Sequence, residues 1–148
     1  MLKKALFDYC DAYVSERITR FSNAISEAQS GANNETKSSA GDKHETGRAM
    51  AQLETENNSK HLTAAKKLKS VLRQIDPNQS VTVVSLGAVV KTDKGNFFIA
   101  ISGGKTNIEN EDYFIVSSAT PVGQAFIGKK AGDVGVVNGK TFKILKVL

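Results

Sequence analysis

Residues 117–148 read SSATPVGQAFIGKKAGDVGVVNGKTFKILKVL, and this stretch decides the fold of the second half of the chain. Thr120 directly before Pro121 is typical of a helix cap followed by a first helical turn, and Gly128 is typical of a helix end. The Asn-Gly pair at 138–139 joins two short runs of alternating apolar residues, which predicts a hairpin with a type I′ turn. The stretch therefore predicts one short helix followed by a closing β-hairpin.

The residues before this stretch also have the short runs of a sheet. The runs VTVVSLGAVVKT, NFFIAIS and DYFIVSS are separated by a turn at DKG and by a Gly-Gly pair. Short apolar or alternating runs between turn residues are typical of strands. Pro77 in IDPNQS ends the preceding helical pattern, because proline disfavours helical geometry in the residue before it. We expect a domain of residues 77–148, a small antiparallel sheet with one short helix.

The first half has the period of helices. One apolar series is Leu2, Leu6, Tyr9, Tyr13, Ile18, Phe21, Ile25 and Ala28, and a second is Met50, Leu53, Asn57, His61, Ala64, Leu68, Val71 and Ile75. Steps of three and four predict two amphipathic helices, each with one narrow apolar stripe. Residues 1–76 are therefore expected to form an antiparallel helical hairpin of coiled-coil type, with its tip near residues 31–47. The fold class is α+β.

Two polar residues of the second series allow two interpretations. Asn57 and His61 at core positions of a coiled coil would set the register of the helices, or they could bind a ligand. His44 and His61 are 17 residues apart without a third soft ligand at helical spacing, which is a poor zinc pattern. The register role is the interpretation favoured for Asn57 and His61.

Composition limits the classes of protein. The 148 residues carry a net charge of +5, and no stretch reaches the roughly 18 to 20 consecutive apolar residues of a membrane span. The charged beginning of the chain is unlike a signal peptide, so we expect a cytoplasmic protein without a membrane partner. Cys10 is the single cysteine, which excludes an intrachain disulfide and is expected to be a small residue near the core.

The combination of these elements resembles the bacterial transcript-cleavage factors of the Gre family. The matching features are the helical hairpin, the pattern Gly-Asp-x-x-Glu at residues 41–45, and Ser-x-x-x-Pro-x-Gly-x-x-x-x-Gly-Lys at residues 117–129. The resemblance spans nearly the whole chain and implies that the second domain is FKBP-like. It also implies a monomeric elongation factor that binds RNA polymerase through the secondary channel.

In that family the tip carboxylates act at the polymerase active site, and the matching residues here are Asp42 and Glu45. The resemblance implies that they help to hold a second Mg²⁺ shared with the polymerase, beside the 3′ end of the nascent RNA. Stimulated cleavage would then be the polymerase's own activity, and this chain would not be an enzyme. Lys43, His44 and Arg48 are candidates for contacts with the partner.

The tip departs from the family after Glu45. Where the family commonly continues with Asn, Ala, Glu and an aromatic residue, this chain has Thr, Gly, Arg and Ala at residues 46–49. Lys43 and Arg48 lower the negative charge of the tip, which also suits a channel-binding inhibitor that does not support cleavage. His44 could orient water, contact phosphate or be merely exposed.

Other interpretations remain for the same residues. Asp42 and Glu45 have the spacing of a helix capping box. An FKBP-like domain could act as a peptidyl-prolyl isomerase or peptide-binding chaperone if its aromatic side chains walled a pocket. The available aromatics are Phe97, Phe98, Tyr113, Phe114, Phe126 and Phe142, most of them at alternating strand positions expected in a core. The basic pI of about 9.3 also permits a structural or DNA-binding hairpin protein.

Overall fold

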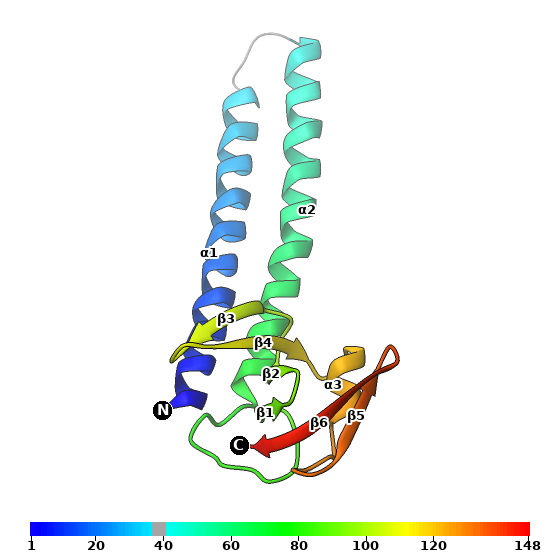
Figure 1. The fold of residues 1–148 in the computed structure, drawn as a ribbon. Helices are drawn as coiled ribbons and strands as arrows, with labels where there is room; N and C mark the ends of the chain where they lie inside the picture. The colour runs from blue at the N-terminus through cyan, green and yellow to red at the C-terminus, as the bar shows by residue number, and fades with distance from the viewer. Residues whose placement is uncertain (37–40) are drawn as a thin grey trace. The chain divides into compact units, whose positions relative to one another are not determined.

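A computed structural model describes residues 1–36 and 41–148, and the side chains of residues 31–36 and 41–45 lie outside that description. Two long helices, α1 and α2, precede six strands and a short helix (Figure 1). The residues form two compact units, one of Val14–Lys69 and one of Met1–Tyr13 with Ser70–Leu148. The division into domains of residues 1–76 and 77–148 stays a prediction.

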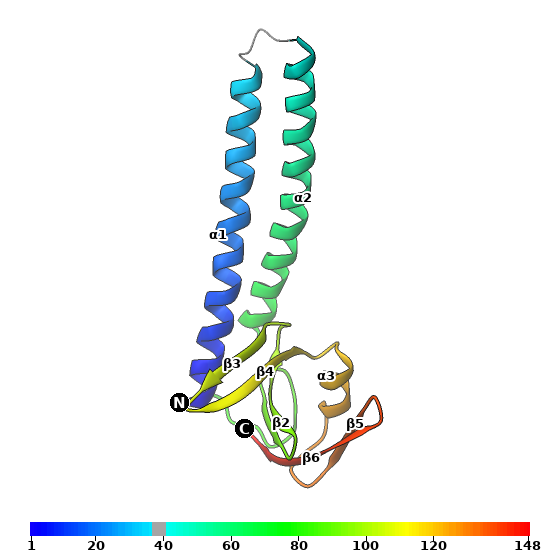
Figure 2. The same ribbon diagram turned by 45° about the horizontal axis from the view of Figure 1, so that its top comes forward.

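The unit Val14–Lys69 consists of parts of α1 (Leu2–Thr36) and α2 (Gly41–Arg73), which run antiparallel (Figure 2). Lys69 Nζ lies 3.3 Å from Ser15 Oγ, and the rings of Phe21 and His61 stack with their centroids 5.0 Å apart. The residue further along α1 contacts the residue earlier in α2, as an antiparallel pair of helices requires. The predicted helical hairpin is therefore confirmed.

The predicted apolar stripe of the second helix is wrong for its first five members, whereas Leu68, Val71 and Ile75 are half-buried or buried. Met50 and Leu53 are each 66% exposed, and Asn57 and Ala64 are exposed as well. The positions of α2 in this unit that are buried or half-buried at steps of four and three are Ala51, Thr55, Asn58, Leu62 and Ala65. Neighbouring series on a helix are about 100° apart and fit the same period equally well. The predicted series contains the larger apolar residues, but the series one position later is the one that is buried.

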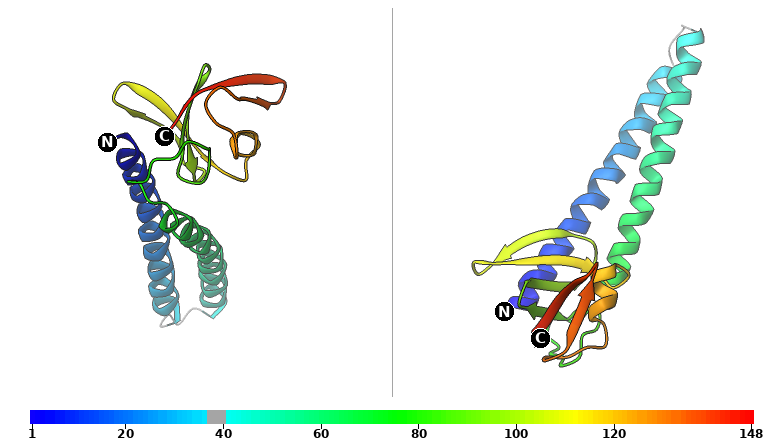
Figure 3. Two further views of the ribbon diagram at one scale, coloured as in Figure 1. Left: turned by 90° about the horizontal axis from the view of Figure 1, so that it is seen from below. Right: turned by 45° about the vertical axis from the view of Figure 1, so that its right-hand side comes forward.

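The second unit contains a six-stranded sheet in the order β3-β4-β2-β1-β6-β5, seen from two sides in Figure 3. Its elements are β1 (Val89–Thr92), β2 (Gly95–Ala100), β3 (Gly104–Ile108), β4 (Glu111–Ser117), α3 (Pro121–Phe126), β5 (Val134–Val137) and β6 (Lys140–Val147). All neighbouring strands are antiparallel except β2 and β4, which are parallel with Phe97 opposite Phe114. An α+β fold with a mainly antiparallel sheet is thus confirmed.

Strand β3 and the parallel pairing of β2 with β4 were not predicted. β3 turns into β4 at Glu109 and Asn110, whose φ angles are +54° and +67° although neither residue is glycine. Because β3 lies outside β4 at the edge, β4 returns beside β2 in the same direction as β2. Conversely, residues 81–88 form no strand, and Val83 makes only an isolated bridge with Lys130.

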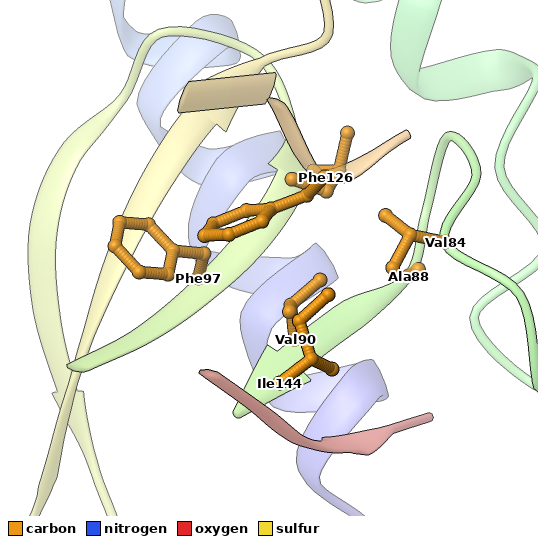
Figure 4. Close-up of a cluster of buried hydrophobic side chains, with 7 residues drawn as sticks. Val84, Ala88, Val90, Phe97, Phe126 and Ile144 are labelled. Atoms are coloured by element: carbon orange, nitrogen blue, oxygen red, sulfur yellow. The ribbon is translucent and has the colours of Figure 1, made fainter. Parts of the chain in front are cut away.

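The core of this unit fills the space between the sheet and α3. Its buried members are Val84, Ala88, Val90, Phe97, Ile99, Phe126 and Ile144, most of them labelled in Figure 4. The rings of Phe97 and Phe126 have centroids 5.2 Å apart. β2 is buried on both faces, because Phe98 between Phe97 and Ile99 is also fully buried. Tyr9, in the part of α1 that belongs to this unit, donates a hydrogen bond of 3.0 Å to the carbonyl oxygen of Gly103.

The local predictions for the last 32 residues are confirmed. Thr120 Oγ1 accepts a hydrogen bond of 3.1 Å from the backbone N–H of Gly123, and Pro121 begins α3. Gly128 beyond the helix has a φ of +82°. The turn at 138–139 has φ angles of +50° and +81°, as a type I′ turn requires.

Replacing Ala65 with glutamate tests the corrected face of α2. Ala65 is 3% exposed and Ala64 is exposed, so Ala65→Glu buries a carboxylate and Ala64→Glu does not. We expect Ala65→Glu to lower the free energy of unfolding by about 2 to 4 kcal/mol and Ala64→Glu by less than about 0.5 kcal/mol. Urea unfolding followed by circular dichroism measures both, and equal losses would contradict the corrected register.

Replacing Gly123 with alanine tests the close approach of α3 to the end of β4. An added Cβ would lie 2.2 Å from the carbonyl oxygen of Ser117, which is backbone and cannot rotate away. We expect Gly123→Ala to lower the stability by about 2 to 3 kcal/mol. Gln124→Ala, at an exposed position of the same helix, is the control and should change it by less than about 0.5 kcal/mol. A thermal shift equal for both variants would refute the expectation.

Candidate functional site at the loop end of the helical pair

The candidate site lies where α2 begins. Because α2 starts at Gly41, Asp42 lies in its first turn and Glu45, the fifth helical residue, begins the second turn, three positions further along. Positions i and i+3 lie on one face of a helix. The side chains of Asp42, Lys43, His44 and Glu45 lie outside the described residues. The arrangement of the candidate carboxylates is therefore known at the level of the backbone.

The first turn of a helix favours negative charge. Its backbone N–H groups have no partner within the helix, and the helix dipole places a partial positive charge there. Both effects stabilise ionised carboxylates. Asp42 is the second residue of α2, whereas an N-cap residue precedes the first helical residue, so the helix bounds do not give Asp42 the N-cap position.

A long helical segment separates these carboxylates from the other end of this unit. Asp42 is 27 positions from Lys69, which corresponds to about 40 Å along a helix at about 1.5 Å per residue. The unit is only two helices thick. Such a pair can carry side chains into a narrow opening that would exclude a globular domain.

Near the loop end, side chains of both helices line a shallow hollow of about 240 Å³. It is lined by Gln29 of α1 and by Arg48, Ala51, Gln52 and Thr55 of α2. Arg48 is exposed and lies three positions after Glu45, so its guanidinium belongs to the same end of the helix. A planar guanidinium binds phosphate or carboxylate oxygens through two parallel hydrogen bonds. Arg48 thus supplies an exposed cationic donor three positions along the helix from Glu45.

Asn57 and His61 were predicted at core positions between the two helices. Asn57 is exposed, so the prediction that it sets the register is wrong. His61 stacks on Phe21, and the guanidinium carbon of Arg20 lies 5.0 Å from the centroid of the same ring. Among the described side chains, no group of three or more His, Cys, Asp or Glu could hold a metal ion.

The aromatic residues of the sheet unit mostly fill its core. Phe97, Phe98, Tyr113 and Phe126 are buried, and Phe97 also packs on Phe114 and Phe142, with centroid distances of 5.6 and 5.9 Å. A hollow of about 470 Å³ beside α3 is lined by Ser85, Leu86, Ser118, Gln124 and Ile127. The aromatic walls that a proline-binding pocket needs are not at this hollow.

One polar cluster in the sheet unit was not found from the sequence. The carboxylate of Glu111 accepts hydrogen bonds from the hydroxyl of Tyr113, at 2.9 Å, and from the ammonium group of Lys91, at 3.1 Å. These two donors hold the pKa of Glu111 below its usual value. Lys91 lies on β1 and Glu111 on β4, so the cluster links two strands that are not neighbours. Lys91 and Glu111 are 20 residues apart in the chain, so no local sequence pattern predicts their contact.

Cys10 is fully buried, as expected for a small residue near the core. Burial raises the pKa of its thiol from 9.0 to about 12. Since the thiolate is the reactive form, burial makes the Cys10 thiol poorly reactive in the folded protein.

No family model and no curated protein matches the chain. Among solved structures, the crystal structure of GreA factor homolog 1 (Gfh1) of Thermus thermophilus is similar, with 15% identity, a TM-score of 0.35, and coverage of 91% of this chain and 92% of that chain. Values this low carry no argument about function. In the part of the chain that is described, none of the helices is long and apolar enough to cross a membrane.

The buried thiol gives a prediction about reactivity. At pH 8 a pKa of about 12 in place of 9.0 lowers the thiolate fraction about a thousandfold. We expect native Cys10 to react with a disulfide reagent at least that much more slowly than the urea-unfolded chain. The raised pKa also means that the contribution of Cys10 to stability is fully present below about pH 9 and is lost as the pH rises towards 12. Equal rates for native and unfolded protein would contradict the burial.

Proposed function

We propose that this protein is a transcription elongation factor that binds RNA polymerase through its secondary channel and stimulates cleavage of backtracked RNA. The observation that carries the proposal is the start of α2 at Gly41, which puts Asp42 and Glu45 three positions apart at the loop end of a long helical pair. The sequence resemblance to Gre factors, which covers both the tip and residues 117–129, supports the same conclusion.

The chemistry needs a partner because the tip has too few ligands of its own. Hydrolysis of a phosphodiester by two metal ions requires one ion at the attacking water and one at the leaving oxygen. Mg²⁺ prefers oxygen ligands and is commonly held by one or two carboxylates together with substrate phosphates and water. Asp42 and Glu45 would complete such a site for an Mg²⁺ shared with the polymerase. The chain is then an accessory factor and not an enzyme.

Arg48 would act on the RNA rather than on the metal. Its exposed side chain follows Glu45 by three positions and lines the hollow between the two helices. A guanidinium there would bind a phosphate near the 3′ end of the nascent RNA. Lys43 and His44 are further candidates for contacts with RNA or polymerase. We propose a cytoplasmic monomer, as this role in transcription implies.

Arg48 also supports a second candidate function. A cation beside the carboxylates could pair with acidic residues of the polymerase active site and hold the tip where nucleotides enter. The factor would then inhibit RNA synthesis without supporting cleavage. Measuring elongation and cleavage on the same stalled complex separates the two functions, since an inhibitor slows elongation and leaves the cleavage rate unchanged.

Replacing both carboxylates by their amides tests the leading proposal. Asp42→Asn with Glu45→Gln keeps shape and size but removes the charges that bind Mg²⁺. We expect stimulated cleavage of a backtracked complex to fall at least about tenfold, on the scale seen when groups that organise a metal site are removed. Binding to polymerase should persist, because the rest of the helical pair is unchanged.

The matched control is Glu54→Gln, an exposed carboxylate on α2 that lies well beyond Glu45 along the helix. It loses one charge on the same helix and should stimulate cleavage like the parent. If the double amide variant stimulates cleavage as well as the parent does, the role of the carboxylates is refuted. A parent protein that binds polymerase and slows elongation without cleavage would favour the inhibitor.

A further inference from the structure

Strand β5 ends the sheet and leaves a free edge. In the order β3-β4-β2-β1-β6-β5 it pairs only with β6, and within the described residues no strand lies on its other side (Figure 1). Free edges expose backbone donors and acceptors that can pair with another chain. Natural proteins usually protect such edges with charged residues, proline or bulges. The sequence of β5 is VGVV, which has none of these protections.

The register shows which backbone groups face outward. The two-residue turn at 138–139 makes Val137 and Lys140 a hydrogen-bonded pair. Since such pairs alternate along an antiparallel ladder, Gly135 also points its backbone groups toward β6. The carbonyl oxygen of Asp133 follows the same pattern, since it accepts a hydrogen bond of 2.9 Å from Ile144, whereas the carbonyl of Ile144 accepts from Gly132, so the regular ladder ends at the start of β5. The N–H and C=O groups of Val134 and Val136 therefore point away from the sheet, in the direction that an added strand would need.

The side chains around this edge form an apolar surface. Val134, Val136 and Leu145 are 44%, 60% and 55% exposed and lie on one face of β5 and β6. The opposite face is closed, because a Cβ on Gly135 would come within 2.8 Å of the ring of Phe126. α3 thus covers one face of the hairpin, and the other face presents three aliphatic side chains to solvent.

The charge around the edge is strongly positive. Residues 127–148 contain five lysines, Lys129, Lys130, Lys140, Lys143 and Lys146, and one acidic residue, Asp133. The carboxylate of Asp133 accepts a hydrogen bond of 3.0 Å from the backbone N–H of Lys130. Among the described side chains, those of residues 1–30 and 46–148, none of the five lysines forms a salt bridge with an acidic residue. A second copy paired edge to edge would bring like charges together, which opposes association.

We propose that β5 is a docking edge for an extended acidic segment of another protein, which adds to the sheet as a seventh strand. The backbone groups of Val134 and Val136 supply the hydrogen bonds. Apolar side chains of the segment rest on the valines, and its carboxylates meet Lys130, Lys140 and Lys143. Main-chain pairing provides affinity, and the charges select an acidic segment over a basic one. The site is separate from the tip and does not depend on the carboxylates there.

A peptide of alternating valine and glutamate, Glu-Val-Glu-Val-Glu-Val-Glu with blocked ends, is the probe. Titrated into the ¹⁵N-labelled full chain, it should shift the amide resonances of Val134 and Val136 more than those of β3, the other edge. The affinity should fall several-fold between about 0.1 and 0.5 M salt, because the charges are exposed and become screened. The analogue with lysine in place of glutamate should bind at least about tenfold more weakly.

Val136→Pro tests the backbone pairing. It removes the outward N–H without breaking a bond to β6, so the fold should persist, as checked by the unchanged amide shifts of the residues around Ile144. We expect this variant to bind the peptide at least about tenfold more weakly, the scale of losing one or two hydrogen bonds. Val136→Thr keeps the N–H and the branched shape, and should lose less affinity than the proline variant.

Three results would overturn the proposal. The first is no shift at Val134 and Val136 with millimolar acidic peptide. The second is equal binding of the glutamate and lysine peptides. The third is a dimer of the full chain in sedimentation that Val136→Pro abolishes, which would make a second copy the occupant. Because these measurements use no polymerase, their outcome is independent of the cleavage assay.

Discussion

The packing of the Phe126 ring against Gly135 is the constraint on which the arrangement of the sheet unit depends. The space that a side chain would fill at residue 135 is taken by the ring, which is fully buried and touches the rings of Phe97 and Phe142 at centroid distances of 5.2 and 5.8 Å. This contact holds α3 over β5. Because the side chains of a strand alternate, it also sends Val134 and Val136 to the opposite face, where they are exposed. The core contact and the apolar docking edge are therefore two sides of one strand.

The helical pair differs from the sheet unit in how little apolar surface it buries. Most of its inward positions on α2 are small or polar, with Leu62 the exception, and Met50 and Leu53 are exposed. A seam of this composition buries little apolar surface, so the pair is not built for a large core. Length is the property that it does provide. A pair of long helices places Asp42 and Glu45 at its loop end, and the proposed role of these residues as half of a shared metal site depends on that placement.

Much of the fold could be predicted because its determinants are local. The short helix follows from Thr120, Pro121 and Gly128, which act on neighbouring backbone groups, and the last hairpin follows from the turn at 138–139. Strand β3 escaped prediction because its turn uses Glu109 and Asn110 in left-handed geometry without a glycine. The face of α2 was misassigned because two series one residue apart have the same period, and α1 selects between them only through packing.

For the candidate site, the sequence by itself supplies a prediction: the spacing of Asp42 and Glu45 and the resemblance at residues 41–45 point to these two carboxylates. The sequence also determined the class of the fold, since periods of 3.6 and 2 are properties of the chain. Only the tertiary structure decided that β5 is an edge strand, that β2 and β4 are parallel, and that Met50 and Leu53 are exposed. These features depend on which distant segments become neighbours, and no local preference of the backbone encodes that choice.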